Sequence, residues 1–261
     1  MRIDQIWSRI VSAFPNIERM TGNAAWLFFD NGLRAVIGFP VLAWMAQYLG
    51  PGRFGELNYS IAVVSIFSFL AALGVNDIIV RESVRNPHKT SEILSTALFL
   101  KFFGGAIAFL LASFTAFFLP GTGDLIPIFL INIIAFGFIF QAFDVFDAYF
   151  QSRLQSRYSV LAKIVAFLLA SSVRIILILA KAPLLFFAGA VLLENIVTAI
   201  ALFSVFSRYG TGLRRIPSFF PKAIIILKSS WPIMLSTFGA MVYMRIDQIL
   251  VRQMISAQAL G

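Results

Sequence analysis

Seven long apolar stretches, each about the length needed to cross a lipid bilayer, occupy most of this chain between Trp26 and Gly261. A transmembrane helix needs roughly 20 apolar residues to cover a hydrocarbon core about 30 Å thick. A transmembrane β-strand needs only about 9–11 residues and alternates apolar with polar side chains, and that alternation is absent here. The sequence therefore predicts an all-α fold, a polytopic bundle of transmembrane helices.

The spans divide the chain into a lobe of six helices and one helix more. We expect them, with ends good to a few residues, at 26–49, 56–74, 94–119, 125–150, 159–181, 184–207 and 229–252. The predicted organisation is a cytoplasmic amphipathic N-terminus (1–25), a six-helix lobe (26–207), a basic cytoplasmic linker (208–228) and the first helix of an incomplete second lobe (229–261). Because an unpaired seventh helix follows six paired ones, we expect the sequence to be a fragment.

The composition agrees with lipid as the solvent. Hydrophobic residues make up 59% of the chain and charged residues 13%, against about 45–50% and about 25% in typical soluble domains. The chain has no cysteine, which excludes disulfides, thiolate metal sites and cysteine nucleophiles.

Lys and Arg report membrane topology, because cytoplasmic loops carry an excess of them. Only three fall on one side of the predicted spans, namely Arg53, Lys181 and Arg252. The other side carries Arg2, Arg9, Arg19, Arg81, Arg85, Lys89, Arg153, Arg157, Arg208, Arg214, Arg215, Lys222 and Lys228. We therefore expect a multi-pass protein of the plasma membrane with a cytoplasmic N-terminus. Basic residues dispersed among loops do not form the single basic face that nucleic acid requires.

Charged residues inside spans are the candidate functional residues, because an ionisable group at mid-membrane needs a polar cavity or a partner. Asp30 and Arg34 stand at i and i+4 in the first span, on one helical face and within reach of each other. The pair either lines a cavity that meets an anionic substrate or a proton, or neutralises itself as a structural pair. The residues alone leave both interpretations open.

Two further spans carry one isolated charge each. Arg174 lies in the fifth span and Glu194 near the middle of the sixth, with no countercharge on its own helix. If the adjacent helices pair, we expect an interhelical ion pair at depth, either functional or structural. In the seventh span, Arg245 and Asp247 are two residues apart and diverge by about 200° on a helix, so each needs its own partner.

A third group lies nearer the predicted cytoplasmic surface. Asp144 and Asp147 share a face of the fourth span, close to Lys163 at the start of the fifth, and we expect them to be solvated. Lys101 and Lys163 lie within about two turns of that surface, and we expect both to snorkel outward.

No cofactor or metal is predicted. Gly50 to Gly55 matches the Gly-x-Gly-x-x-Gly dinucleotide pattern, but the match joins two membrane helices rather than a strand and a helix, so we interpret it as a turn. The sequence has no P-loop, and its only histidine, His88, lies in a predicted loop. The parts of a Ser-His-Asp or His-metal site are too few, and we expect no enzyme.

Short motifs in order along the chain resemble the polysaccharide-biosynthesis flippases, a family that includes O-antigen and other lipid-linked oligosaccharide translocases and shares a superfamily with multidrug antiporters. The motifs are Asn23, Trp26, Asp30, Arg34, Tyr48-Leu49-Gly50-Pro51, Phe54-Gly55, Leu73-Gly74, Arg81-Glu82, Phe150-Gln151-Ser152, Trp231-Pro232 and Arg245-Ile246-Asp247-Gln248. The resemblance implies a transporter with two six-helix lobes that open alternately around a cationic cavity. This chain departs from that pattern by ending soon after the seventh span.

The resemblance implies a lipid-linked oligosaccharide on a polyprenyl diphosphate as substrate, the missing C-terminal lobe as partner, and glycan polymerase and ligase machinery as further partners. The side-chain chemistry is consistent with this substrate, because Arg34, Arg174 and Arg245 are able to bind a diphosphate by bidentate hydrogen bonds. Three alternatives remain: a cation-coupled multidrug antiporter that uses Asp30 or Glu194, a membrane-embedded glycan polymerase or transferase, and a truncated product without function.

Overall fold

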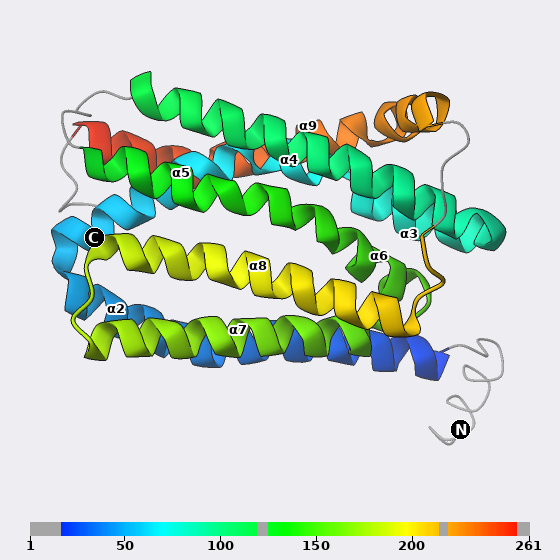
Figure 1. The fold of residues 1–261 in the computed structure, drawn as a ribbon, viewed down its shortest axis with the longest axis horizontal. Helices are drawn as coiled ribbons and strands as arrows, with labels where there is room; N and C mark the ends of the chain where they lie inside the picture. The colour runs from blue at the N-terminus through cyan, green and yellow to red at the C-terminus, as the bar shows by residue number, and fades with distance from the viewer. Residues whose placement is uncertain (1–16, 119–124, 214–218, 255–261) are drawn as a thin grey trace, which may run out of the picture.

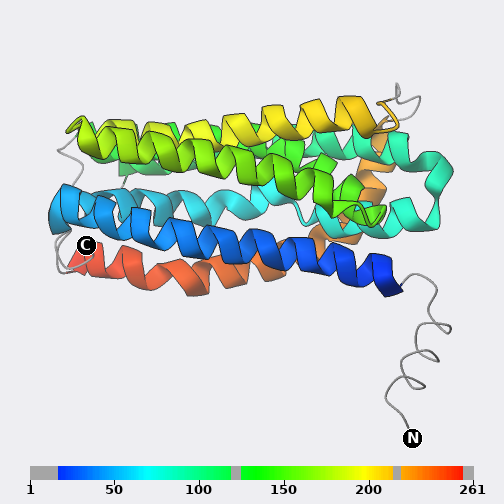
Figure 2. The same ribbon diagram turned by 90° about the horizontal axis from the view of Figure 1, so that it is seen from below.

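The computed structural model describes residues 17–118, 125–213 and 219–254, and every regular element in these ranges is a helix (Figure 1). Six helical stretches of this part of the chain are long and apolar enough to cross a membrane. The first of them turns back on itself, so seven arms run between the two ends of the bundle, as the sequence predicts (Figure 2). The protein is thus a multi-pass, all-α membrane protein.

Helix α2 (Ile17–Ala72) contains the first two predicted spans and the turn between them. Only one residue inside it leaves helical geometry, Gly50 with φ 72° and ψ 168°. A side chain disfavours that φ, so glycine suits the position, and Pro51 then opens the second arm with the φ that a helix start requires. The expected link of six residues is wrong, since a single residue makes the reversal.

Helix α3 (Val75–Arg85) begins where a connector is expected. Leu73 and Gly74, with φ 53° and 59°, end the second arm of α2 and redirect the chain. A Cβ added at Gly74 would lie 2.9 Å from the Cβ of Ile233, so glycine also permits a close approach of α9. The short 3₁₀ helix η1 (Pro87–Lys89) leads into the next span.

Helix α4 (Thr90–Phe118) is continuous, whereas the fourth predicted span is broken. It consists of α5 (Leu125–Phe140), a 3₁₀ turn η2 (Gln141–Asp144) and α6 (Val145–Ser152). The expectation of one helix over 125–150 is therefore wrong in this detail. A 3₁₀ stretch inside a helix often marks a hinge or a functional site.

Helices α7 (Ser156–Leu179) and α8 (Leu184–Tyr209) form an antiparallel pair joined by a short link, as predicted. The first arm of α2 lies parallel to α7. Near its start, the Asn23 side-chain oxygen accepts a hydrogen bond of 2.8 Å from the backbone N–H of Ser156, which caps α7 from a neighbouring helix.

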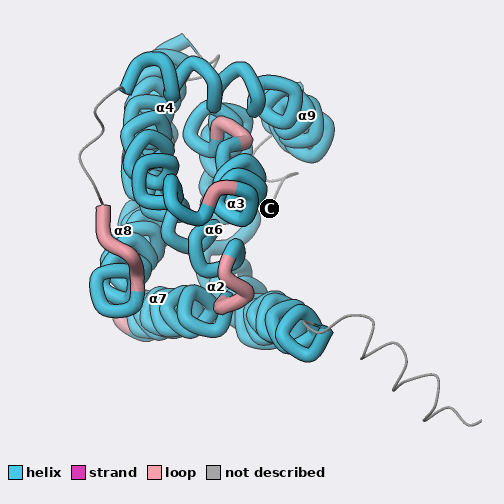
Figure 3. Tube along the Cα trace, turned by 90° about the vertical axis from the view of Figure 1, so that its right-hand side faces the viewer, coloured by secondary structure: helices cyan, strands magenta, loops and turns pink. Residues whose placement is uncertain are grey.

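Helix α9 (Phe219–Met254) begins well before the expected residue 229, so part of the predicted linker is helical. It runs antiparallel to the second arm of α2. The rings of Phe69 and Phe238 are 4.8 Å apart. Closer to the C-terminal end of α9, the Arg252 guanidinium lies 5.6 Å from the centre of the Tyr59 ring. Seen end-on, α9 lies across the bundle from α8 (Figure 3).

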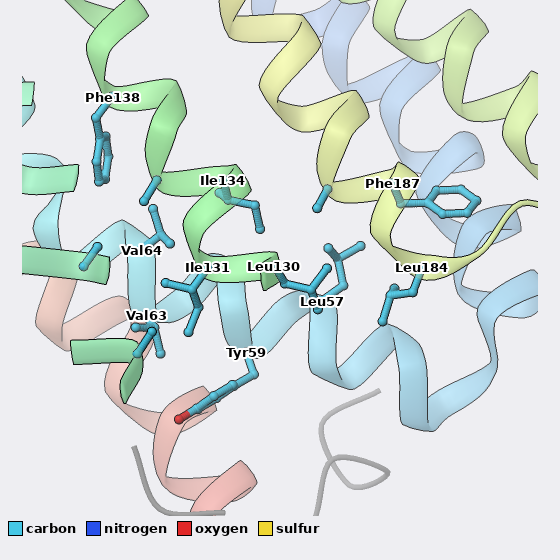
Figure 4. Close-up of a cluster of buried hydrophobic side chains, with 14 of the residues drawn as sticks. Leu57, Tyr59, Val63, Val64, Leu130, Ile131, Ile134, Phe138, Leu184 and Phe187 are labelled. Atoms are coloured by element: carbon cyan, nitrogen blue, oxygen red, sulfur yellow. The ribbon is translucent and has the colours of Figure 1, made fainter. Parts of the chain in front are cut away.

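Two apolar clusters hold the bundle together, one toward each end. The far cluster, drawn in Figure 4, includes Leu57, Tyr59, Val63, Leu130, Ile131, Ile134, Phe138, Leu184 and Phe187. The near cluster, at the end of the bundle that carries the start of α2, includes Leu73, Val75, Ile79, Leu94, Ala97, Val145, Phe146, Phe150, Leu202 and Phe206. Small residues such as Ala97 let neighbouring helices approach closely, as is usual in membrane bundles.

Candidate functional site

The charged residues of α7 and α8 lie between the two apolar clusters. On α8, Glu194 falls between Ala188 of the far cluster and Leu202 of the near cluster. On α7, the stretch from Lys163 to Arg174 falls between Ala162 and Ile178 in the same way. The bundle therefore contains a polar layer within its apolar core, at a depth where unpaired charges are costly.

The Asp30–Arg34 pair forms as predicted. The Arg34 Nε donates to the Asp30 Oδ1 at 2.9 Å, one helical turn along α2. The Asp30 side chain is 10% exposed and that of Arg34 is 30% exposed. The carboxylate is thus largely removed from solvent, whereas the guanidinium reaches the surface of the bundle.

The predicted interhelical pair is also confirmed. The Arg174 Nη2 on α7 lies 2.7 Å from the Glu194 Oε2 on α8, and both side chains are about four-fifths buried. At that distance the contact is a charge-assisted hydrogen bond, roughly twice as strong as a neutral one.

One contact that sequence reasoning missed joins these two pairs. The Arg34 Nη1 lies 3.3 Å from the other oxygen of Glu194, and its Nη2 donates to the Lys163 carbonyl oxygen at 3.3 Å. Asp30, Arg34, Glu194 and Arg174 therefore form one chain of ion pairs across three helices, here named the Arg34 network. Arg34 and Glu194 are 160 residues apart in sequence, and no local pattern connects them.

Two residues of α7 beside the network carried no signal in the sequence. The Arg34 guanidinium carbon lies 5.0 Å from the centre of the Phe167 ring, a cation–π distance. Ser171 falls one turn after Phe167 and three residues before Arg174, hence on the same face of α7. Its hydroxyl is buried and has no hydrogen-bond partner among the described residues.

Arg245 and Asp247 are not part of the network in the described residues. The Arg245 Nη1 donates to the Gln248 Oε1 on its own helix at 3.2 Å, and the exposed Asp247 accepts the backbone N–H of Gln248 at 2.8 Å. Both contacts are thus with Gln248, and neither residue forms an ion pair with another helix among the described residues, so the expected separate partners are not seen. Their role in binding stays a prediction.

A second charged group lies among residues of the near apolar cluster, and it corrects the expectation that both lysines snorkel outward. Lys101 does not snorkel outward, because the residue is 1% exposed and its Nζ donates to the Asn76 Oδ1 at 3.1 Å. Lys163 also points inward, with its Nζ 2.8 Å from the Asp147 Oδ2. The expectation of a solvated pair is therefore wrong for Asp147, whose side chain is 13% exposed. Asn76, Lys101, Asp144, Asp147 and Lys163 are here named the Lys101 cluster.

The Arg34 network suits an anion better than a cation or a metal. Its two arginines present forked N–H donors that match carboxylate and phosphate oxygens, and its acids neutralise them. Among the described residues no three His, Cys, Asp or Glu side chains converge to hold a metal ion. An anion that displaces Glu194 would take a position that both guanidinium groups, those of Arg34 and Arg174, already contact.

Comparison with known proteins supplies the family. A search of curated proteins and a search of solved structures gave no match. The family model described as polysaccharide biosynthesis protein matches residues 20–261, which is nearly the whole chain. The match covers both the Arg34 network and the Lys101 cluster. This chain therefore belongs to the polysaccharide biosynthesis protein family.

Proposed function

We propose that this protein translocates a polyprenyl-diphosphate-linked oligosaccharide across the plasma membrane for polysaccharide or O-antigen synthesis. It does so by alternating access and without covalent chemistry. The observation that carries the proposal is the sharing of Glu194 by Arg34 and Arg174, at 3.3 Å and 2.7 Å. Two guanidinium groups held around one doubly accepting carboxylate match the geometry that a diphosphate group requires.

Glu194 occupies the place that the substrate anion takes. In the empty protein it keeps both arginines in position and prevents two unpaired cations in an apolar environment. A diphosphate entering the layer replaces Glu194 as their partner, and the carboxylate returns when the diphosphate leaves. The buried Ser171 hydroxyl adds one neutral hydrogen bond, while the polyprenyl tail stays in lipid.

The alternative of a cation-coupled drug exporter fits the network less well. Both of its carboxylates already contact an arginine, so an organic cation would have to displace a guanidinium from each. A drug exporter would change drug susceptibility without a glycan defect. A glycan polymerase or transferase would instead form a new glycosidic bond.

The distribution of basic residues supports a cytoplasmic N-terminus. Six in the described ranges flank helix ends at the end of the bundle that carries the start of α2, where α3, α6 and α8 end (Figure 1), against Arg53, Lys181 and Arg252 at the other end. They are Arg81, Arg85, Lys89, Arg153, Arg157 and Arg208. The substrate would therefore enter from this end. A second lobe, a polymerase and a ligase are the partners that this function requires.

The binding step gives a direct test. Arg174→Gln should weaken binding of a short polyprenyl diphosphate to the purified protein in lipid nanodiscs about 10–100-fold. A hydrogen bond to a charged group contributes about 1.5–3 kcal/mol, and each 1.4 kcal/mol is about a factor of ten in affinity. Isothermal titration calorimetry measures the change, with polyprenyl monophosphate as the weaker competitor.

Arg208→Gln is the matched control, because Arg208 is exposed and lies over the ring of Tyr209 rather than in the polar layer. Its affinity should stay within about twofold of the unsubstituted protein, since a distant exposed charge is screened by salt. Equal effects of the two substitutions, or equal binding of mono- and diphosphate, would refute the proposed site.

A further inference from the structure

A cavity of about 300 Å³ lies at the end of the bundle that carries the start of α2, between α2 and the turn that joins α6 to α7. Its lining includes Asn23, Trp26, Gln155, Arg157 and Tyr158, and no described residue that lines it is acidic. This cavity is here named the rim pocket. It contains no residue of the Arg34 network or of the Lys101 cluster, so the proposed transport step does not use it.

The turn from α6 to α7 forms one wall of the rim pocket, and backbone hydrogen bonds hold it. Leu154, with φ 55°, redirects the chain after α6, and the Gln155 N–H donates to the Phe150 carbonyl oxygen at 2.9 Å. The N–H of the next residue, Ser156, donates to the Asn23 side chain of α2. The wall is therefore fixed from both helices, and a site formed before its ligand arrives loses less freedom on binding.

Arg157 is the cation of the rim pocket. It is exposed, and it has no hydrogen bond, ion pair or ring contact within the described part of the chain. The other described arginines that flank helix ends here each have a partner: Arg81 and Arg85 contact Glu82, Arg153 the Tyr149 ring and Arg208 the Tyr209 ring. Arg157 thus keeps five N–H donors for a ligand.

Asn23 supplies a second set of unused donors. Its Oδ1 accepts the Ser156 N–H at 2.8 Å, so its Nδ2 carries two N–H groups, which have no partner among the described residues. Gln155 and Tyr158 add an amide and a hydroxyl group to the lining. A lining with several donors and a positive charge suits an anion, because hydrogen bonds to an ionised acceptor are the strong ones.

The rim pocket lies at the depth of lipid headgroups. Helix α7 has 24 residues, which is roughly 36 Å at 1.5 Å per residue, whereas the hydrocarbon core is about 30 Å thick. Trp26 and Tyr158 agree with this depth, because amphipathic rings gather at the membrane interface. The Phe29 ring, on a residue that is 53% exposed, lies edge-on to the Trp26 ring at 6.1 Å. An apolar surface therefore begins beside the pocket.

We propose that the rim pocket binds the headgroup phosphate of an anionic phospholipid from the leaflet at this end of the bundle. Arg157 pairs with the phosphate, the Asn23 amide donates a hydrogen bond to it, and the acyl chains lie along α2 beside Phe29. Basic pockets between transmembrane helices bind anionic headgroups in this way. The bound phosphate contacts both α2 and α7, and so joins the two helices that Arg34 joins deeper in the membrane.

Lipid titration of the purified, delipidated full chain in detergent, read by native mass spectrometry, tests the site. Arg157→Gln should weaken binding of phosphatidylglycerol about fivefold, the contribution of one basic side chain near anionic lipid. Arg85→Gln is the control, because it removes the same charge from a 70% exposed side chain at the same end of the bundle. Its affinity should stay within about twofold of the unsubstituted protein. Equal losses in the two variants would refute a specific site.

Protection of a thiol locates the bound lipid. Because the chain has no cysteine, Gly22→Cys introduces a single thiol at the wall of the rim pocket, where an added Cβ meets no atom within 4 Å. Phosphatidylglycerol should slow its labelling at least about threefold, and phosphatidylcholine, whose headgroup has no net charge, should not. The exposed control Asn86→Cys should label at an unchanged rate. Adding Arg157→Gln to Gly22→Cys should abolish the protection.

Three results would overturn the proposal. Protection that persists in the variant with Arg157→Gln would remove the assigned role of that residue. Equal protection by inorganic phosphate would make the ligand a free anion, and protection by polyprenyl diphosphate but not by phosphatidylglycerol would make it the transport substrate. The site does not rest on the proposed function, whose own test is diphosphate binding by Arg174→Gln, so either proposal is able to fail alone.

Discussion

Glu194→Gln should bind a polyprenyl diphosphate about tenfold more tightly and yet export at least about tenfold less polysaccharide. Glutamine keeps the shape of the side chain but removes the negative charge that competes with the substrate for Arg34 and Arg174. The network changes from neutral to a net charge of +1. At an effective dielectric constant of about 20, two unit charges about 4 Å apart interact by about 4 kcal/mol, so a tenfold gain is a conservative expectation.

Export falls in the same variant because release requires a group that reclaims the arginines. The two effects are measured by calorimetry on purified protein and by surface polysaccharide at matched protein levels in the native host. Glu82→Gln is the control, since Glu82 pairs with arginines only on the exposed surface of α3, and both quantities should stay unchanged. Weaker binding by Glu194→Gln would show that the carboxylate contacts the substrate rather than competing with it.

Arg34→Ala should have the largest effect on both export and stability. Arg34 contacts Asp30, Glu194 and the Lys163 carbonyl, so its loss disconnects α2 from the α7–α8 pair. Asp30, 7% exposed as a residue, has no other ion-pair partner among the described residues. Removal of one partner of a buried ion pair costs about 3–5 kcal/mol, and we expect about 3 kcal/mol here because Arg34 is partly exposed.

Thermal unfolding in detergent and surface polysaccharide together measure this prediction, and a double variant separates its two parts. Asp30→Asn with Arg34→Gln removes both charges, so it should regain most of the lost stability while export stays below about one hundredth of normal. Arg81→Ala, on the exposed face of α3, should cost under about 1 kcal/mol. Recovery of export in the double variant would mean that Arg34 serves stability alone.

Sequence patterns predict the helices and the local charge pairs of this protein because both depend on residues close in the chain. The Asp30–Arg34 pair follows from one helical turn, and the Arg174–Glu194 pair follows from adjacency of two helices joined by a short link. The contact between Arg34 and Glu194 depends on the parallel packing of α2 against α7, which no periodicity encodes. The complete network could therefore be identified only from the structure.

The wrong expectations have physical causes as well. Lys101 was expected at the surface because its distance was counted from the end of the apolar run, whereas α4 begins at Thr90 and carries it into the core. The 3₁₀ turn at Gln141–Asp144 contains neither glycine nor proline, so no local signal marks it. Gly50 reverses the chain alone because Pro51 and the residues after it are able to continue as a helix, a possibility that a loop prediction from Gly and Pro does not include.

The central claim is that water and substrate reach the polar layer beside the Arg34 network. Ser171→Cys tests it most directly, as this side chain lies on the face of α7 between Phe167 and Arg174 in a chain without other cysteines. Leu168→Cys, on the exposed apolar surface of the same helix, is the control. In membranes, a water-soluble, membrane-impermeant thiol reagent should label Ser171→Cys, polyprenyl diphosphate should slow that labelling at least about tenfold, and Leu168→Cys should stay unlabelled. No labelling of Ser171→Cys, or labelling that the diphosphate does not change, would contradict the account and make the network a dry structural seam.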